Sequence, residues 1–157
     1  MTGVQTCALP ISFGPGGSQL YLIDRQPPAV EAMDMTPRDG GLPHQDPLWV
    51  APICAEPSLL QLGTDPLHPE DPRPRLAYAV CFRSSEMFVV DTALGRVGDQ
   101  VLTGRGPNGI AIDGKNRRAF VANFLDNTIG VIDLDPSHTS YNRMVLRIGT
   151  VTALVHQ

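Results

Sequence analysis

The chain has 157 residues, a formal net charge of -4 at pH 7 and a single lysine, Lys115. An acidic chain of this kind lacks the basic field that general nucleic-acid binders and anionic-membrane binders need. It also contains no apolar run of about 18 residues, so the sequence predicts no transmembrane segment.

The first 12 residues differ in character from the rest. Residues 1–11 read Met-Thr-Gly-Val-Gln-Thr-Cys-Ala-Leu-Pro-Ile, which resembles the conceptual translation of a common short-read sequencing adapter. The segment has neither the charged start nor the long apolar stretch of a signal peptide. We therefore expect 1–12 to be an artefact of assembling environmental reads, with the authentic N-terminus and any export signal missing. An ordinary N-terminus is the alternative.

Residues 13–26 combine a turn and a strand. The cluster Phe13–Gly17 is typical of a turn, and the following run Gln19–Asp24 ends in aspartate, as the run Glu86–Asp91 does. We interpret 13–26 as the remnant of an earlier four-stranded unit, with Gln19–Asp24 as its third strand. An unrelated short buried strand would give the same pattern.

A proline-rich segment follows. Residues 27–74 hold 11 of the 15 prolines, and proline lacks an amide donor and biases its predecessor away from helix. We expect 27–56 to be a loop insertion, partly ordered and anchored by Trp49. Short strands are predicted within the proline-rich segment at Leu48–Ala51 and Ser58–Leu62.

Two strand-rich units complete the chain. The unit 57–102 is predicted to hold Ser58–Leu62, Leu76–Phe82, Glu86–Asp91 and Arg96–Leu102. The unit 103–150 is predicted to hold Gly109–Asp113, Arg118–Asn123, Thr128–Asp133 and Arg143–Ile148. Apolar residues occupy adjacent positions in its third strand, which suits a sheet covered on both faces. The tail, 151–157, leads into a further unit or is a second artefact.

The two units repeat each other. Ala77–Asp91 lies over Ala119–Asp133 without a gap at an offset of 42 residues, and Phe82 then falls on Phe124. A period of about 40 to 50 residues, each holding several short strands, is typical of propeller blades. The sequence therefore predicts an all-β, partial β-propeller. It would consist of about two four-stranded antiparallel blades plus the proline-rich loop insertion.

The second unit resembles the YVTN family of β-propeller repeats. The matching residues are Pro107, Gly109–Ala111, Asp113–Lys115, Phe120–Asn123 and Asn127–Asp133. The first unit departs from the family pattern, with Cys81 in place of Asn123 and Ser85-Glu86 in place of Asn127-Thr128. The resemblance implies an exported bacterial or archaeal protein, located in the periplasm or at the cell surface.

The resemblance also leads to an expectation about function. It favours a non-catalytic scaffold that binds a protein or a small molecule, and we predict no catalytic residue, metal or cofactor in this chain. The alternative is a part of a propeller enzyme, since related propellers include lactonase-like hydrolases and quinoprotein-type dehydrogenases. Most of its active-site residues would then lie outside these 157 residues.

Few residues suggest chemistry. Cys54 and Cys81 would form a disulfide in an oxidising compartment, but a buried free thiol at Cys81 is the favoured alternative. The four histidines, His44, His68, His138 and His156, are dispersed and show no metal-ligand spacing. The acidic pairs Asp24/Asp34 and Asp133/Asp135 read as turn formers, with a calcium site as the minor alternative.

The candidate ligand-binding surface is predicted at the link between the two units. Gly104–Gly109 is glycine-rich but lacks the Gly-Lys-Ser/Thr ending of a phosphate loop, and a strand follows it. We expect it to turn the chain from one blade into the next at the end of the propeller where ligands bind. The candidate ligand-binding residues are Arg105, Asn108, Leu125 and Asp126.

Overall fold

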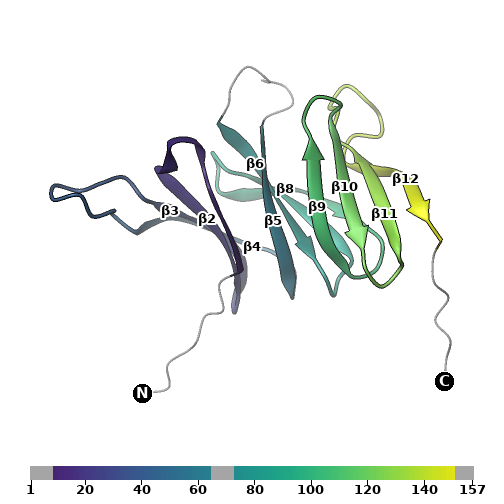
Figure 1. The fold of residues 1–157 in the computed structure, drawn as a ribbon, viewed down its shortest axis with the longest axis horizontal. Helices are drawn as coiled ribbons and strands as arrows, with labels where there is room; N and C mark the ends of the chain where they lie inside the picture. Colours follow the sequence, from purple (N-terminus) through teal and green to yellow (C-terminus); the bar gives the residue numbers. More distant parts are fainter. Residues whose placement is uncertain (1–8, 65–72, 151–157) are drawn as a thin grey trace.

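The computed structural model describes residues 9–64 and 73–150. These residues form three four-stranded antiparallel sheets that follow one another along the chain and lie side by side (Figure 1). Strand order within each sheet follows the sequence, so each sheet is a simple meander. The all-β, partial β-propeller fold is confirmed.

The strands have the following bounds. The first sheet holds β1 (Leu9–Phe13), β2 (Gln19–Arg25), β3 (Pro28–Asp34) and β4 (Asp46–Pro52), with a short 3-10 turn, η1 (Pro15–Gly17), after β1. The second sheet holds β5 (Pro57–Thr64), β6 (Pro74–Cys81), β7 (Glu86–Asp91) and β8 (Arg96–Leu102). The third sheet holds β9 (Pro107–Asp113), β10 (Arg118–Asn123), β11 (Thr128–Asp133) and β12 (Arg143–Gly149).

The first sheet corrects the expected organisation. Residues 27–56 are not a loop insertion, because β3 and β4 lie within them, and the described chain contains three sheets rather than about two. Proline is compatible with these strands because Pro28 opens β3, and because Pro47 and Pro52 lie in β4, an edge strand. The proline-rich loop is confined to residues 35–45, which an isolated bridge between Pro37 and Pro43 closes.

The run Gln19–Asp24 is also reassigned. It lies in β2, the second strand of its sheet and not the third, because Leu9–Phe13 pairs with it on one side. Part of β1 therefore comes from the segment that resembles a sequencing adapter. The strand-ending aspartate that corresponds to Asp91 and Asp133 is Asp34, at the end of β3.

Two apolar cores hold the three sheets together. Tyr21, Val30 and Ala32 of the first sheet pack against Leu60 and other residues of the second. The core between the second and third sheets contains, among others, Tyr78, Val80, Met87, Val89, Ala119, Val121 and Ile132. Each core is built from residues at alternate strand positions, because successive side chains point to opposite faces of a sheet.

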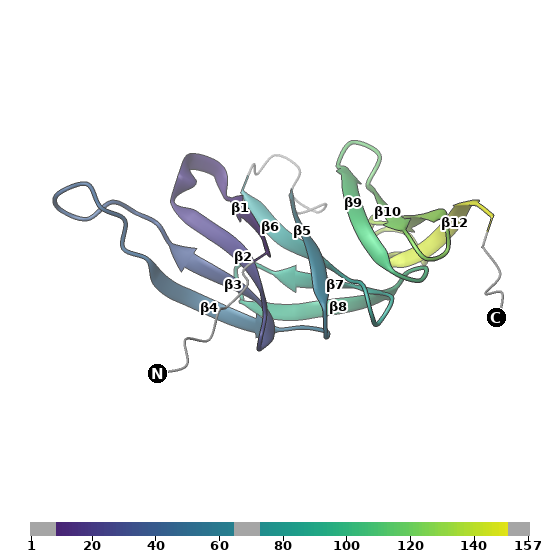
Figure 2. The ribbon, with the colours of Figure 1, turned by 60° about the horizontal axis from the view of Figure 1, so that its bottom comes forward.

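The sheets pack as the blades of a propeller do. The first strands β1, β5 and β9 are neighbours, and so are the last strands β4, β8 and β12 (Figure 2). Trp49 on β4 fastens the first two sheets, since its Nε1 donates to the Thr92 carbonyl at 3.0 Å and its ring lies against Gly95. The expected anchoring role of Trp49 is therefore seen, but in a strand and not in a loop.

A disulfide joins the first two sheets at another point. Cys54, in the link between β4 and β5, is bonded to Cys81 at the end of β6, with 6.1 Å between the Cα atoms. Cys81 is fully buried. The structure thus pairs the two cysteines that the sequence singles out. This pairing stands in place of the free thiol at Cys81 that the sequence favoured.

No helix in the described parts of the chain is long and apolar enough to cross a membrane.

Candidate functional site

Three turns meet at one end of the second and third sheets. They are residues 82–85 between β6 and β7, residues 103–106 between β8 and β9, and residues 124–127 between β10 and β11; we call this set the loop surface. The link 103–106 is held from both sides by backbone bonds. Thr103 N–H donates to the Ser85 carbonyl at 2.9 Å, and Phe124 N–H donates to the Gly106 carbonyl at 2.9 Å.

Asn123 fixes the same link through its side chain. It is almost fully buried, its Oδ1 accepts the Gly104 N–H at 3.0 Å, and its Nδ2 donates to Thr128 Oγ1 at 3.2 Å. A Cβ at position 104 would come within 2.6 Å of the Asn123 side chain, so a glycine is required there. The backbone of the loop surface is therefore held by buried contacts within the protein.

Arg105 and Asp126, two of the predicted ligand residues, bind each other. The Asp126 carboxylate accepts the Arg105 backbone N–H at 2.8 Å and its Nε–H at 2.5 Å. The backbone hydrogen bond from Arg105 is the main reason that the pKa of Asp126 is lowered, against the effect of burial. Asp126 is 3% exposed, so its carboxylate acts within the protein, while Arg105 remains partly exposed.

Two apolar side chains of the loop surface point outward, and so does Leu102, which directly precedes it. Phe124 is 67% exposed, Leu125 is 49% exposed, and Leu102 at the end of β8 is 73% exposed. Leu125 also touches the backbone of Gly106. Asn108, the fourth predicted residue, is exposed on β9 and lines a shallow hollow of about 430 Å³ together with Phe124 and Ile129. The four predicted residues thus lie at one end of the third sheet but do not converge on one pocket.

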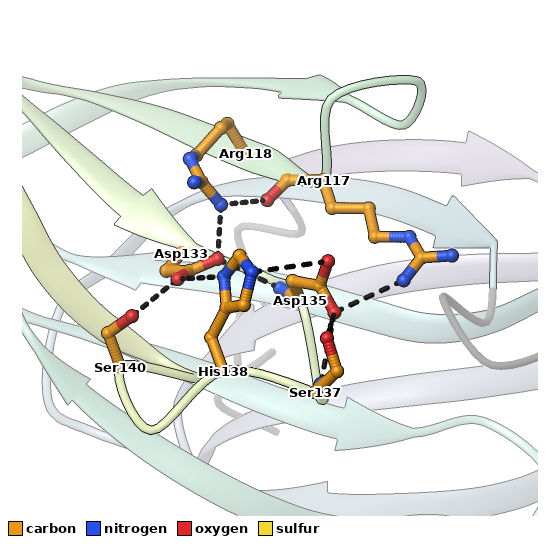
Figure 3. Close-up of polar contacts among 7 residues, drawn as sticks. All are labelled: Arg117, Arg118, Asp133, Asp135, Ser137, His138 and Ser140. Atoms are coloured by element: carbon orange, nitrogen blue, oxygen red, sulfur yellow. Dashed lines mark hydrogen bonds and ion pairs between the residues drawn. The ribbon is translucent and has the colours of Figure 1, made fainter.

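A second polar cluster lies at the opposite end of the third sheet (Figure 3). Its centre is Asp133, which is 1% exposed at the end of β11. Its carboxylate is paired with Arg118 and accepts hydrogen bonds from Ser140 Oγ at 2.5 Å and the Asp135 N–H at 3.0 Å. His138 Nδ1 lies 2.8 Å from its Oδ2.

The cluster keeps its central carboxylate ionised. Burial alone would raise the pKa of Asp133, but the hydrogen bonds from Ser140, Asp135 and His138 and the charge of Arg118 together lower that pKa to about 2. The pKa of Asp135 is also lowered to about 2, chiefly by hydrogen bonds from Ser137 and also by Arg117.

The contacts of this cluster hold a loop in place and do not form a catalytic pair. In a nucleophile–base pair the serine hydroxyl would donate to the histidine. Here Ser140 donates to Asp133, and His138 Nε2 lies 3.8 Å from Asp135. These contacts fasten residues 134–142 to the end of the sheet. The turn-forming role predicted for Asp133 and Asp135 is therefore seen, although the sequence did not indicate that Arg118, His138 and Ser140 would join them.

The remaining candidates lie apart. His44, in the loop between β3 and β4, has its Nδ1 3.3 Å from an Asp46 oxygen, and Asp34 caps the start of the same loop by accepting the Thr36 N–H at 2.8 Å. His68 and His156 lie outside the described residues. Within the described ranges no group of three histidine, cysteine or acidic residues is placed to hold a metal ion.

The chain matches no family model and no curated protein. It is similar in structure to hydrazine synthase of Kuenenia stuttgartiensis, with 21% identity and a TM-score of 0.68, over 90% of this chain and 35% of that one. A putative 6-phosphogluconolactonase from Bacteroides uniformis gives 19% identity and a TM-score of 0.67, over 89% and 40%. The dihydro-heme d1 dehydrogenase NirN gives 15% identity and a TM-score of 0.64, over 88% and 27%.

These similarities define the class of fold. The neighbours are β-propeller proteins, and the chain spans between 27% and 40% of the length of the three named here. At this level of identity the likeness shows the propeller fold alone. Membership of the YVTN family stays a prediction from the residues of the third sheet.

Proposed function

We propose that the three sheets are a non-catalytic propeller scaffold that binds a protein or small-molecule ligand through the loop surface. The main support for the proposal is that the loop surface combines a rigid backbone with exposed apolar side chains. Its backbone is fixed by the buried side chains of Asn123 and Asp126, while Phe124 and Leu125 point outward. Apolar groups on a rigid loop bind with little loss of conformational entropy.

The polar contacts favour binding over catalysis at this surface. The Asp126 carboxylate is engaged by Arg105 through both a backbone and a side-chain N–H. A carboxylate with a lowered pKa that is already hydrogen-bonded is a poor general base, because such a base needs a pKa near the working pH. Arg105 and Asp126 are therefore assigned to positioning the loops, and Phe124 and Leu125 to contacting the ligand.

The experiment is a selection of peptides from a displayed random library on the immobilised chain. Enriched peptides are then titrated against Phe124→Ser and against Leu94→Ser. Leu94 is 60% exposed in the turn between β7 and β8, so it matches Phe124 in exposure but lies outside the loop surface. We expect Phe124→Ser to weaken binding about tenfold or more and Leu94→Ser to leave it unchanged. Equal affinity for both variants would refute this site.

An enzymatic role is the second candidate, and it rests on the named neighbours. One is a putative 6-phosphogluconolactonase and another a dihydro-heme d1 dehydrogenase. In that case the loop surface would supply only part of a site shared with further blades. Hydrolysis of 6-phosphogluconolactone by the purified chain, lost in Arg105→Ala but kept in Arg96→Ala, would favour the enzyme over the scaffold; Arg96 is exposed at the start of β8, outside the loop surface.

An exported location belongs to the same proposal. The bonded pair Cys54 and Cys81 supports it, because disulfides persist mainly in oxidising compartments. Mass spectrometry after alkylation of the unreduced, unfolded chain tests it. Both cysteines should resist alkylation in protein purified from the periplasm, and labelling of both would contradict the proposed location.

A further inference from the structure

A cleft lies between the first and second sheets, at the end opposite the loop surface. Its volume is about 290 Å³, and the residues that line it fall within 15–21, 73–75 and 92–93. β6 begins at this cleft with Pro74 and ends at the loop surface with Cys81. None of the lining residues belongs to 1–12, the segment that resembles a sequencing adapter. The cleft is formed by two neighbouring sheets of the described chain and is not on an end face.

Three acceptors on the walls of the cleft are already used within the protein. The Pro74 carbonyl accepts the Thr92 hydroxyl at 2.6 Å, and the Arg75 carbonyl accepts the Thr92 N–H at 3.1 Å. The Gln19 Oε1 accepts the Tyr21 hydroxyl at 2.6 Å, which leaves the Nε2 of Gln19 as a donor. The side-chain groups left for a ligand are therefore mainly donors.

Two arginines make the cleft positive. Arg73 and Arg75 line it, and no aspartate or glutamate is among the described residues that do so. Arg75 lies on the face of β6 that packs on the first sheet, because it is two residues before the buried Ala77. It is partly buried, and no side chain of the described ranges forms an ion pair or hydrogen bond with its guanidinium. An anion bound beside Arg75 would compensate this charge.

Aspartates near the cleft serve other contacts. Asp34, which pairs with Gln19 in the register of the first sheet, accepts the Thr36 N–H at 2.8 Å. Asp91, at the end of β7, accepts the Ala93 N–H at 2.9 Å. Both carboxylates therefore cap turns.

The repeat shows which group the cleft lacks. The residues 42 positions after Arg75 and Ala93 are Arg117 and Asp135. The backbone agrees with this correspondence, since in both sheets the arginine carbonyl accepts the N–H of the residue before the second position, at 3.1 and 2.9 Å. In the third sheet Arg117 Nη1 lies 3.1 Å from Asp135 Oδ1. Ala93 in the second sheet has no carboxylate to offer to Arg75, and both residues line the cleft.

We propose that the cleft binds a small organic anion whose carboxylate or phosphate group pairs with Arg75, as the Asp135 carboxylate pairs with Arg117.

The chemistry of the walls fits such a ligand. A guanidinium presents its N–H donors in a planar fork that matches carboxylate and phosphate oxygens. The Nε2 of Gln19 and the hydroxyl of Ser18 are further donors in the cleft. The volume of about 290 Å³ is close to the lower limit of small-molecule pockets, roughly 300 Å³, so a ligand of a few carbon atoms fits best. This site is separate from the loop surface, and its occupancy does not depend on a ligand there.

The test is a titration of the isotope-labelled 157-residue chain, followed by two-dimensional NMR of its amide and guanidinium N–H groups. The probes are glycerol phosphate and succinate at constant ionic strength, with glycerol as the neutral control. We expect at least one anion to give saturable shifts of the Arg75 Nε–H and Ala93 N–H signals, and glycerol to give none. The anion that binds more tightly identifies the group that the cleft prefers. If neither anion gives saturable shifts, the proposal is overturned.

Removing the charge of Arg75 tests its role directly. Arg75→Gln should weaken binding about tenfold or more, as read from the Ala93 N–H signal, because a charge-assisted hydrogen bond is lost. Arg96→Gln removes an exposed arginine at the start of β8, outside the cleft, and should leave binding unchanged. The amide spectrum verifies that each variant is folded. A folded Arg75→Gln variant that binds as the unaltered chain does would refute the site.

A second substitution supplies the carboxylate from within the protein. Ala93→Asp places it where the third sheet has Asp135, so it should pair with Arg75 and exclude the added anion. Leu94→Asp adds the same charge at the next residue, which is 60% exposed and does not line the cleft. We expect anion binding to be lost in Ala93→Asp and kept in Leu94→Asp. Equal binding by these two variants contradicts the proposed position of the anion.

Discussion

Replacing Asp133 with asparagine should destabilise the chain at neutral pH. Asp133 is 1% exposed and its carboxylate is bound by Arg118, Ser140 and His138. A pKa lowered from 3.8 to about 2 corresponds to roughly 2 to 3 kcal/mol of stabilisation by the ionised form. Asparagine cannot carry that charge and leaves Arg118 without its partner. We therefore expect the free energy of unfolding to fall by about 2 to 3 kcal/mol.

The same reasoning fixes the pH dependence. Because the folded-state pKa is lowered, the contribution of Asp133 is fully present above about pH 4 and is lost as the pH falls toward 2. Urea unfolding followed by circular dichroism, at neutral pH and at low pH, measures both effects. The difference between the unaltered chain and Asp133→Asn should be large at neutral pH and should shrink on acidification.

Asp91 provides the matched control, since it occupies the same position one repeat earlier. It is only partly buried and accepts backbone N–H groups from Ala93 and Leu94 at 2.9 and 3.0 Å. Asp91→Asn should cost less than about 1 kcal/mol, as is usual for an exposed turn. Equal losses for Asp91→Asn and Asp133→Asn would refute the claim that the buried cluster stabilises the third sheet.

Three further outcomes are expected. Gly104→Ala should lower the melting temperature by several degrees, because a Cβ there would lie 2.6 Å from the Asn123 side chain; Gly114→Ala, where nothing lies within 4 Å, is its control in a thermal scan. Cys54→Ser should lower the melting temperature of the oxidised chain and have a much smaller effect when a reductant is present, since the bond to Cys81 is then absent in both proteins. Trp49→Phe should cost about 1 kcal/mol in urea unfolding, because it removes the hydrogen bond to the Thr92 carbonyl and keeps the aromatic packing; no loss would contradict the fastening role of Trp49.

The repeat made the last two sheets predictable from the sequence. Alternating apolar residues and the offset of 42 residues located β6, β7, β10 and β11 to within two residues of their observed ends. The first sheet was harder to predict because a high proline content is typical of loops and does not distinguish a loop from strands that tolerate proline. Pro28, Pro47 and Pro52 lie where a missing amide donor costs little, at a strand start or in an edge strand, and the sequence does not indicate which strands are edges.

The sequence predicted the approximate location of the candidate site but not the contacts between its side chains. The glycine-rich link correctly indicated that residues near 105 and 125 would meet at one end of the third sheet. The pairing of Arg105 with Asp126 depends on side-chain positions that a strand pattern does not specify. The Asp133 cluster was missed for the same reason, although the following loop is rich in side chains able to form hydrogen bonds, which was a signal. Those residues are Asp135, Ser137, His138, Thr139, Ser140, Tyr141 and Asn142.

Nuclear Overhauser contacts in the isotope-labelled chain test the three-sheet propeller arrangement most directly. We expect contacts between the Trp49 indole and the Gly95 Hα protons, and between the Asn142 side-chain amide and the Asp99 side chain, because these pairs join the first sheet to the second and the second to the third. We also expect cross-strand contacts between Glu31 and Val50. A folded chain with the contacts of the last two sheets, but with none between residues 28–34 and 46–52, would contradict the first sheet and the repeated packing.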